Sequence, residues 1–129
     1  MNITGGANCV LHECDIFDNA EHGVSVSGAS RANIEHSRLN GSRGNGLNIR
    51  GAGTEPAVFN CKIGTHGRDN VAVTDWAEPL LLACEIAGSP AAGVSFAAGG
   101  AGTVRGCNIH GGAWQIMFAT SWARHRMPS

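Results

Sequence analysis

Short segments in which apolar residues alternate with polar or small residues recur along the chain at nearly constant spacing. Gly23-Val24-Ser25-Val26 and Gly93-Val94-Ser95-Phe96 are two of them. An alternation with a period of two is typical of a β-strand that buries one face. The strand-forming pairs in these segments are Val24 and Val26, Leu47 and Ile49, Val71 and Val73, Val94 and Phe96, and Ile116 and Phe118. Each pair predicts one short strand.

A second pattern indicates that these strands belong to a repeat. Triplets that open with Cys or Ser and end in Ile or Leu begin at positions 14, 37, 61, 84 and 107, which are separated by 23, 24, 23 and 23 residues. Strands this short have to stack coil on coil, ~4.8 Å apart, to share a core. The period therefore predicts an all-β fold, a parallel β-helix of about five coils. We expect it to cover residues 1–120, with a cap or tail at 121–129.

The leucine-rich repeat is the alternative with a similar period. Ile16-Phe17-Asp18-Asn19 partly matches its consensus, but the return segment here contains a second strand opened by Gly or Asn instead of a helix. Over roughly residues 7–119, the repeat instead resembles that of the pectate-lyase-like superfamily. This resemblance implies a right-handed single-stranded parallel β-helix with three parallel sheets, in which the Val24 segments form the first sheet. It also implies that a tight bend at the Cys or Ser position leads from a second sheet into a third.

The repeat predicts which side chains form the core. In addition to the strand pairs, we expect near-complete burial of Leu11, Ile16, Ile34, Leu39, Val58, Ile63, Leu81, Ile86, Val104 and Ile109. The bend position predicts a column of small, reduced, buried thiols that includes Cys61, Cys84 and Cys107. Cys9 lies outside this column and is the thiol expected to react fastest. Only Cys9 and Cys14 have the C-x₂₋₄-C spacing, which gives one pair of ligands where a structural zinc site needs two.

Charged residues follow the bend, where side chains are expected to point outward. Asp15 beside Arg38, and Lys62 beside Glu85, are predicted to pair across neighbouring coils. The ends of the chain differ in sign, because residues 1–22 carry only acidic charges and residues 101–129 only basic ones. Opposite charges at two exposed solenoid ends predict a homo-oligomer that stacks end to end.

Enzymes of the superfamily that the repeat resembles place their chemistry on the outer face of the first sheet and its preceding turn. The resemblance implies catalytic candidates at Glu21, His22, Arg43, His66, Arg68 and Asp69, and ligand-binding candidates at Asn45, Asn48, Arg50 and Trp76. Hydrolysis of a glycoside requires two carboxyl groups ~5–9.5 Å apart. Glu21 and Asp69 are the central acidic residues of this face, and two coils separate them by ~10 Å.

The residues favour a noncatalytic β-helix module, a rigid scaffold or a recognition surface for a glycan or a protein. The catalytic motifs of the superfamily are absent, and the chain begins inside a coil, which indicates a relationship to a larger protein. The alternative is a lyase, epimerase or hydrolase acting on an acidic glycan. No cofactor is expected, and His12, Glu13, Glu35 and His36 are interpreted as solvated edge residues, so no metal is expected.

Charge and hydropathy exclude two further classes of partner. The net charge of −1 argues against nucleic-acid binding. No stretch approaches the roughly 18 apolar residues that span a membrane. The first residues lack the charged and apolar regions of a secretory signal, which favours a cytoplasmic location.

Overall fold

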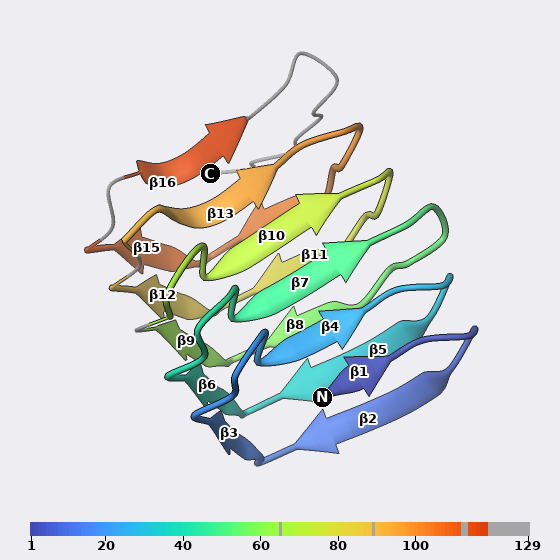
Figure 1. Cartoon of the computed structure of the whole chain (residues 1–129), viewed down its shortest axis with the longest axis horizontal. Helices are drawn as coiled ribbons and strands as arrows, with labels where there is room; N and C mark the ends of the chain where they lie inside the picture. Colours follow the sequence, from blue (N-terminus) through green and yellow to red (C-terminus); the bar gives the residue numbers. More distant parts are fainter. Residues whose placement is uncertain (65, 89, 112–113, 119–129) are drawn as a thin grey trace.

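The computed structural model describes residues 1–64, 66–88, 90–111 and 114–118, and these residues form a parallel β-solenoid of about five turns (Figure 1). Each turn adds one strand to each of three parallel sheets. Sheet A consists of β1 (Asn2–Ile3), β4 (Val24–Val26), β7 (Leu47–Arg50), β10 (Val71–Thr74), β13 (Ala92–Phe96) and β16 (Trp114–Phe118). The predicted fold class is confirmed, while the predicted cap or tail at 121–129 lies outside the described residues.

Sheets B and C complete each coil, and both have five strands. Sheet B consists of β2 (Asn8–His12), β5 (Arg31–Glu35), β8 (Ala57–Phe59), β11 (Leu80–Leu82) and β14 (Thr103–Arg105). Sheet C consists of β3 (Asp15–Phe17), β6 (Arg38–Asn40), β9 (Lys62–Gly64), β12 (Glu85–Ala87) and β15 (Asn108–His110). The described part of the chain has no helix long and apolar enough to cross a membrane.

Equivalent positions of the repeat lie directly above one another. In sheet A, Val71 pairs with Leu47 on one side and with Val94 on the other. The fifth strand pair, Ile116 and Phe118, comes one residue earlier in its repeat than the other pairs, yet Ile116 still pairs with Val94. The predicted register is therefore confirmed.

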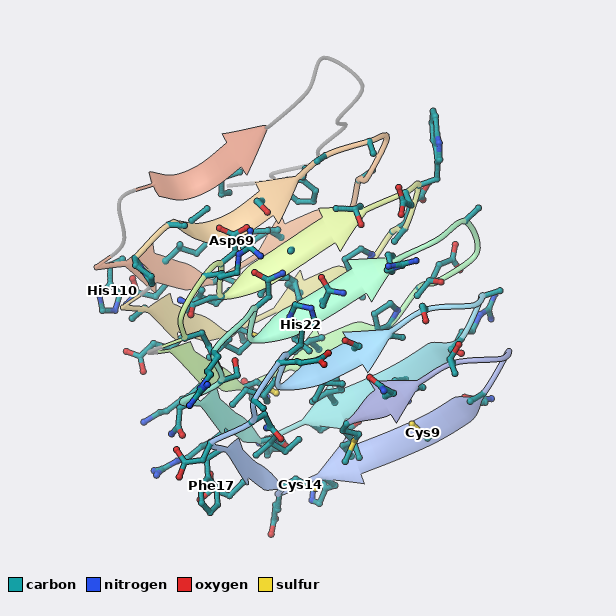
Figure 2. The ribbon with its side chains drawn as sticks, viewed as in Figure 1. Cys9, Cys14, Phe17, His22, Asp69 and His110 are labelled. Atoms are coloured by element: carbon teal, nitrogen blue, oxygen red, sulfur yellow. The ribbon has the colours of Figure 1, made fainter. Side chains whose placement is uncertain are left out.

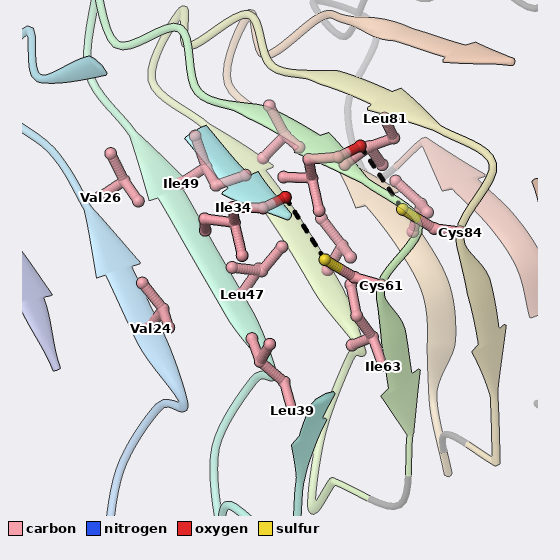
Figure 3. Close-up of a cluster of buried hydrophobic side chains, with 14 of the residues drawn as sticks. Val24, Val26, Ile34, Leu39, Leu47, Ile49, Cys61, Ile63, Leu81 and Cys84 are labelled. Carbon is pink, nitrogen blue, oxygen red and sulfur yellow. Dashed lines mark hydrogen bonds between the residues drawn. The ribbon is translucent and has the colours of Figure 1, made fainter. Parts of the chain in front are cut away.

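The aliphatic residues of all three sheets meet in one core inside the coils (Figure 3). Val71 and Val94 are fully buried, as the register requires. Leu11, Ile16, Ile109 and Ile116 are only half-buried, contrary to the prediction. They belong to terminal strands of the three sheets, which have a neighbouring coil on one side only.

The Cys and Ser column at the bend satisfies main-chain groups of the neighbouring coil. The hydroxyl of Ser37 accepts the N–H of Cys14 at 3.1 Å and donates to the carbonyl of Glu35 at 2.9 Å. The thiols also reach carbonyls of the preceding coil, with Cys61 3.4 Å from that of Ile34 and Cys84 3.5 Å from that of Val58 (Figure 3). The column therefore selects small side chains that can both donate and accept.

All five cysteines are free thiols, and two of the three thiols expected to be buried are buried. Cys61 and Cys84 are enclosed between coils, as predicted. Cys107 is only half-buried, and Cys9 and Cys14 are half-buried as well. The prediction of a buried Cys107 is wrong because β15, which follows it, is the last strand of sheet C and leaves the bend open on one side.

The charged residues after the bend have the predicted register but not the predicted contacts. Asp15 is the ladder partner of Arg38, and Glu85 that of Lys62. Among the described residues, however, no ion pair within 4.0 Å joins either couple, and Glu85 instead approaches His110 at 3.7 Å. Exposed long side chains gain little from such a pair, because water solvates both charges and fixing them costs rotamer entropy.

Candidate functional site

The outer face of sheet A carries a polar depression of about 350 Å³ over β1, β4 and β7. Its lining side chains come from the strands and from the turn that precedes β4: Asn2, Thr4, Glu21, His22, Ser25, Ser27, Asn48 and Arg50. Four candidates from the sequence, Glu21, His22, Asn48 and Arg50, are thus brought to one place. We refer to it below as the sheet A depression.

Strand alternation places polar side chains on this face. Asn2, Ser25 and Asn48 form one ladder across β1, β4 and β7. Each of the last two lies between buried aliphatic residues of its own strand, so its side chain points away from the core. Asn2, Thr4 and Ser27 were not among the sequence candidates, although the same alternation would have found them.

Glu21 and Arg50 supply the charges of the depression. Both side chains are exposed, and among the described residues neither has an ion-pair or hydrogen-bond partner for its charged group. Asn48 accepts a hydrogen bond on Oδ1 from Asn45 Nδ2 at 3.1 Å, which leaves its own amide hydrogens available. The site therefore offers an acceptor, a cation and amide donors to a ligand.

The hydrogen bonding of His22 defines the tautomer of its neutral ring. Its Nδ1 accepts the main-chain N–H of Asn45 at 2.9 Å, so the neutral ring carries its proton on Nε2. Gly44 makes room for this ring, because a Cβ at that position would lie 2.7 Å from Nδ1. His22 thus presents a donor to the depression, whereas a general base would need a free acceptor nitrogen.

Asn45 and Asp69 continue the same hydrogen-bond pattern along the stack. Asn45 Oδ1 accepts the N–H of Asp69 at 3.0 Å, and Asp69 Oδ1 accepts the N–H of Ala92 at 2.9 Å. The second carboxylate oxygen of Asp69 accepts the Ser95 hydroxyl at 2.8 Å. Figure 2 shows Asp69 and His22 along the edge where the strands of sheet A begin. Asp69 therefore stabilises neighbouring coils and does not line the depression.

His66 lies inside the molecule, so its predicted place on the outer face is wrong. It is 4% exposed. Its Nε2 lies 2.8 Å from the Leu39 carbonyl, and its Nδ1 lies 3.2 Å from the main-chain nitrogen and 2.6 Å from the hydroxyl oxygen of Ser42. Burial lowers the pKa of His66 below that of an exposed imidazole. A neutral ring with Nε2 protonated satisfies these contacts, and its role is to close the turn before β10.

The remaining sequence candidates do not join the sheet A depression. Arg43 lines a separate hollow of about 370 Å³ together with Asp18, Asn19, Ala20 and Gly41. Arg68 is exposed on the turn before β10. Trp76 follows β10, is 51% exposed and covers Gly99, where a Cβ would lie 2.5 Å from the ring. An aromatic platform is thus present near sheet A but outside the depression.

The edge cluster near His12 brings imidazoles and carboxylates together. His12 lies 3.3 Å from Glu13 and 3.3 Å from Glu35, and its ring meets His36 edge-on at 5.6 Å between centroids. In the described ranges, no three His, Cys, Asp or Glu side chains converge as metal ligands. The side chains of His12 and Glu13 are more than half exposed, so the contacts are those of a solvated edge.

Sheet C carries a second depression, of about 370 Å³, that the sequence candidates did not include. Arg38, Lys62 and Glu85 project from adjacent strands around it. The sequence contained a signal for this depression, because all three residues follow the bend, where side chains are expected to point outward. Its charged groups form a single ladder on one sheet face, whereas the sheet A depression combines strand residues with a carboxylate and an imidazole from a turn.

Comparison with known proteins identifies the family. The model of the right-handed β-helix region matches residues 1–127. The chain belongs to the right-handed β-helix family. Membership is consistent with the resemblance to the pectate-lyase-like superfamily. No curated protein and no solved structure matches the chain.

Proposed function

We propose that this β-helix protein is a noncatalytic recognition module whose sheet A depression binds a glycan that carries carboxylate groups. The observation that carries this proposal is the presence of Arg50 and Glu21 in one polar depression, both without partners among the described residues. Arg50 suits a uronate carboxylate, because a guanidinium donates two parallel hydrogen bonds to it. Glu21, Asn48 and the serine hydroxyls suit the hydroxyl groups of a sugar.

The hydrogen bonding of the site supports recognition over catalysis. A glycosidase needs a second carboxyl group near Glu21, whereas both oxygens of Asp69 are engaged by Ala92 and Ser95. A lyase needs a base beside the sugar carbon that loses its proton. The accepting nitrogen of His22, Nδ1, is already hydrogen-bonded to the main-chain N–H of Asn45 and is not free to act as that base. The rigid stack of coils supplies a preformed surface, which reduces the entropy lost on binding.

Titration calorimetry with oligouronates and neutral oligosaccharides of equal length tests the proposal. We expect the oligouronates to bind more tightly, and Arg50→Ala to weaken their binding by about tenfold or more, the effect of losing a charged hydrogen bond. Arg105→Ala is the matched control, because Arg105 is exposed on sheet B, away from the depression. Equal binding of both glycan classes, or equal loss in both variants, would contradict the proposal.

An activity assay separates this function from the enzymatic alternative. Incubation of uronate polymers with the protein, with and without calcium, should give no unsaturated product by absorbance. Product that disappears in a His22→Gln variant would instead establish a lyase, with His22 acting through a protonation state other than that deduced above.

A further inference from the structure

The bend column places thiols next to one another on successive coils. Glu85 and Asn108 are ladder partners in sheet C, so the residues directly before them, Cys84 and Cys107, are also neighbours. The main-chain N–H of Cys84 donates to the sulfur of Cys107 at 3.5 Å. The stacking distance of ~4.8 Å between strands lies within the Cα–Cα range of ~4.4–6.8 Å found for disulfides.

The two side chains also affect each other's ionisation. When the Cys84 thiol turns its proton from the Val58 carbonyl to this neighbour, the hydrogen bond lowers the pKa of Cys107 to about 6 and raises that of Cys84. Cys61 is the neighbour of Cys84 on the other side, and the same interaction lowers its pKa. The thiol of Cys84 has one proton and stabilises one neighbouring thiolate at a time.

Access to solvent decides which neighbour reacts. Cys107 is half-buried at the open end of the column, whereas Cys61 is 1% exposed. A thiolate that solvent reaches is the form attacked by oxidants. Cys14 is also half-buried, but Ser37 separates it from the other thiols of the column, so it has no sulfur beside it.

We propose that Cys107 and Cys84 form an oxidisable dithiol, which a hydroperoxide converts into a disulfide between neighbouring coils. The thiolate of Cys107 attacks the peroxide, breaks its O–O bond and becomes a sulfenic acid, and the other oxygen leaves as hydroxide or alkoxide. The sulfur of Cys84 then displaces the hydroxyl from Cys107, and the proton of Cys84 leaves with it as water. Two electrons pass from the pair of thiols to one peroxide.

Treatment of the whole chain with a small excess of hydrogen peroxide tests this assignment. We expect the intact mass to fall by two hydrogen atoms, and peptide mapping without reductant to recover the segments of Cys84 and Cys107 linked. In Cys84→Ser, the reaction should stop at a sulfenic acid on Cys107, which a dimedone adduct reports. Cys14→Ser is the matched control and should leave the linkage unchanged.

The rate of disulfide formation should also depend on pH. Because the pKa of Cys107 is lowered, the rate should level off well below the pH of about 8.5 at which an ordinary thiol is half ionised. A linkage of Cys84 to Cys61 or Cys9 would overturn the proposal. Oxidation of Cys107 beyond the sulfenic acid with Cys84 intact would also overturn it.

Discussion

Ser37 and Asp69 each accept a hydrogen bond from a main-chain N–H of the neighbouring coil. His22 and Asn45 do the same at the edge where the strands of sheet A begin. In a parallel solenoid, turn residues have main-chain donors that no strand pairs, and a buried donor left unpaired costs ~1–3 kcal/mol. These polar side chains therefore stabilise the fold, and that role explains why a titratable group such as Asp69 lies outside the sheet A depression.

Burial of His66 predicts a loss of stability in mild acid. The pKa of His66 is lowered in the folded state, whereas the unfolded chain binds a proton near the ordinary value of 6.5. The stability that neutral His66 contributes is thus fully present above pH 6.5 and is lost as the pH falls towards the lowered pKa. Urea unfolding between pH 7.5 and 5.5 should show a smaller decrease in unfolding free energy for His66→Gln than for the parent chain.

The parent chain and the variant carry the same carboxylates and other histidines, so the difference between their slopes isolates His66. A matched substitution at an exposed position, His36→Gln, measures how much the slope changes when a surface histidine is replaced. Identical slopes for all three proteins would show that His66 is not the group that links stability to pH.

The strands of this fold keep a constant register from coil to coil, and the turns between them accommodate differences in length. The turn that joins Ile49 to Ala57 holds one residue more than the turn that joins Val26 to Asn33, yet Ala57 and Asn33 are ladder partners. In the same way, Ile116 arrives one residue early and still pairs with Val94. The strands have to keep register because a slip by one residue would turn the core side chains outward.

Position along the stack predicts the cost of truncating a core side chain. Leu81 is 1% exposed between two complete coils, so Leu81→Ala should lower the unfolding free energy by about 2–5 kcal/mol. Leu11 occupies the same ladder position in β2 at the end of sheet B, where it is half-buried. Leu11→Ala should cost clearly less in the same denaturant titration, and an equal cost would mean that the first coil is enclosed.

The sequence predicts strands better than it predicts sites. Val71 and Val94 could be placed because a period of two and a repeat of 23–24 residues determine which face is buried. His66 was misplaced because a polar residue in a turn can point either way, and its inward direction depends on Ser42 and Leu39 of the preceding coil. The missing contact between Lys62 and Glu85 has a similar cause, since register does not determine how exposed side chains extend.

At the scale of the whole molecule, the first coil leaves an unpaired edge. β1, β2 and β3 are terminal strands of sheets A, B and C, and Val10 and Phe17 are exposed on this coil at 61% and 57%. Exposed strand edges pair with other chains unless something covers them. The acidic residues of this coil, among them Glu13 and Asp15, favour a basic partner surface.

We therefore predict that this edge mediates end-to-end association of the chain. At the opposite end of the stack, the described part of the last coil carries the basic residue Arg105. Arg124 and Arg126 lie outside the described residues. Sedimentation velocity should reveal oligomers at low salt that dissociate at high salt, because ions screen exposed charges beyond ~8 Å at physiological strength. A monomer at high protein concentration and low salt would show that both ends are covered.

The hydrogen bonds between coils all run along the stack, since the strands lie across it (Figure 1). A pulling force applied between β1 and β16 would thus break the hydrogen bonds of one coil at a time. It would not shear the hydrogen bonds of many coils simultaneously. Each released coil of 23 residues would add roughly 80 Å of extended chain. Under tension along the stack, the molecule would therefore lengthen in nearly equal steps, one coil at a time, at low force.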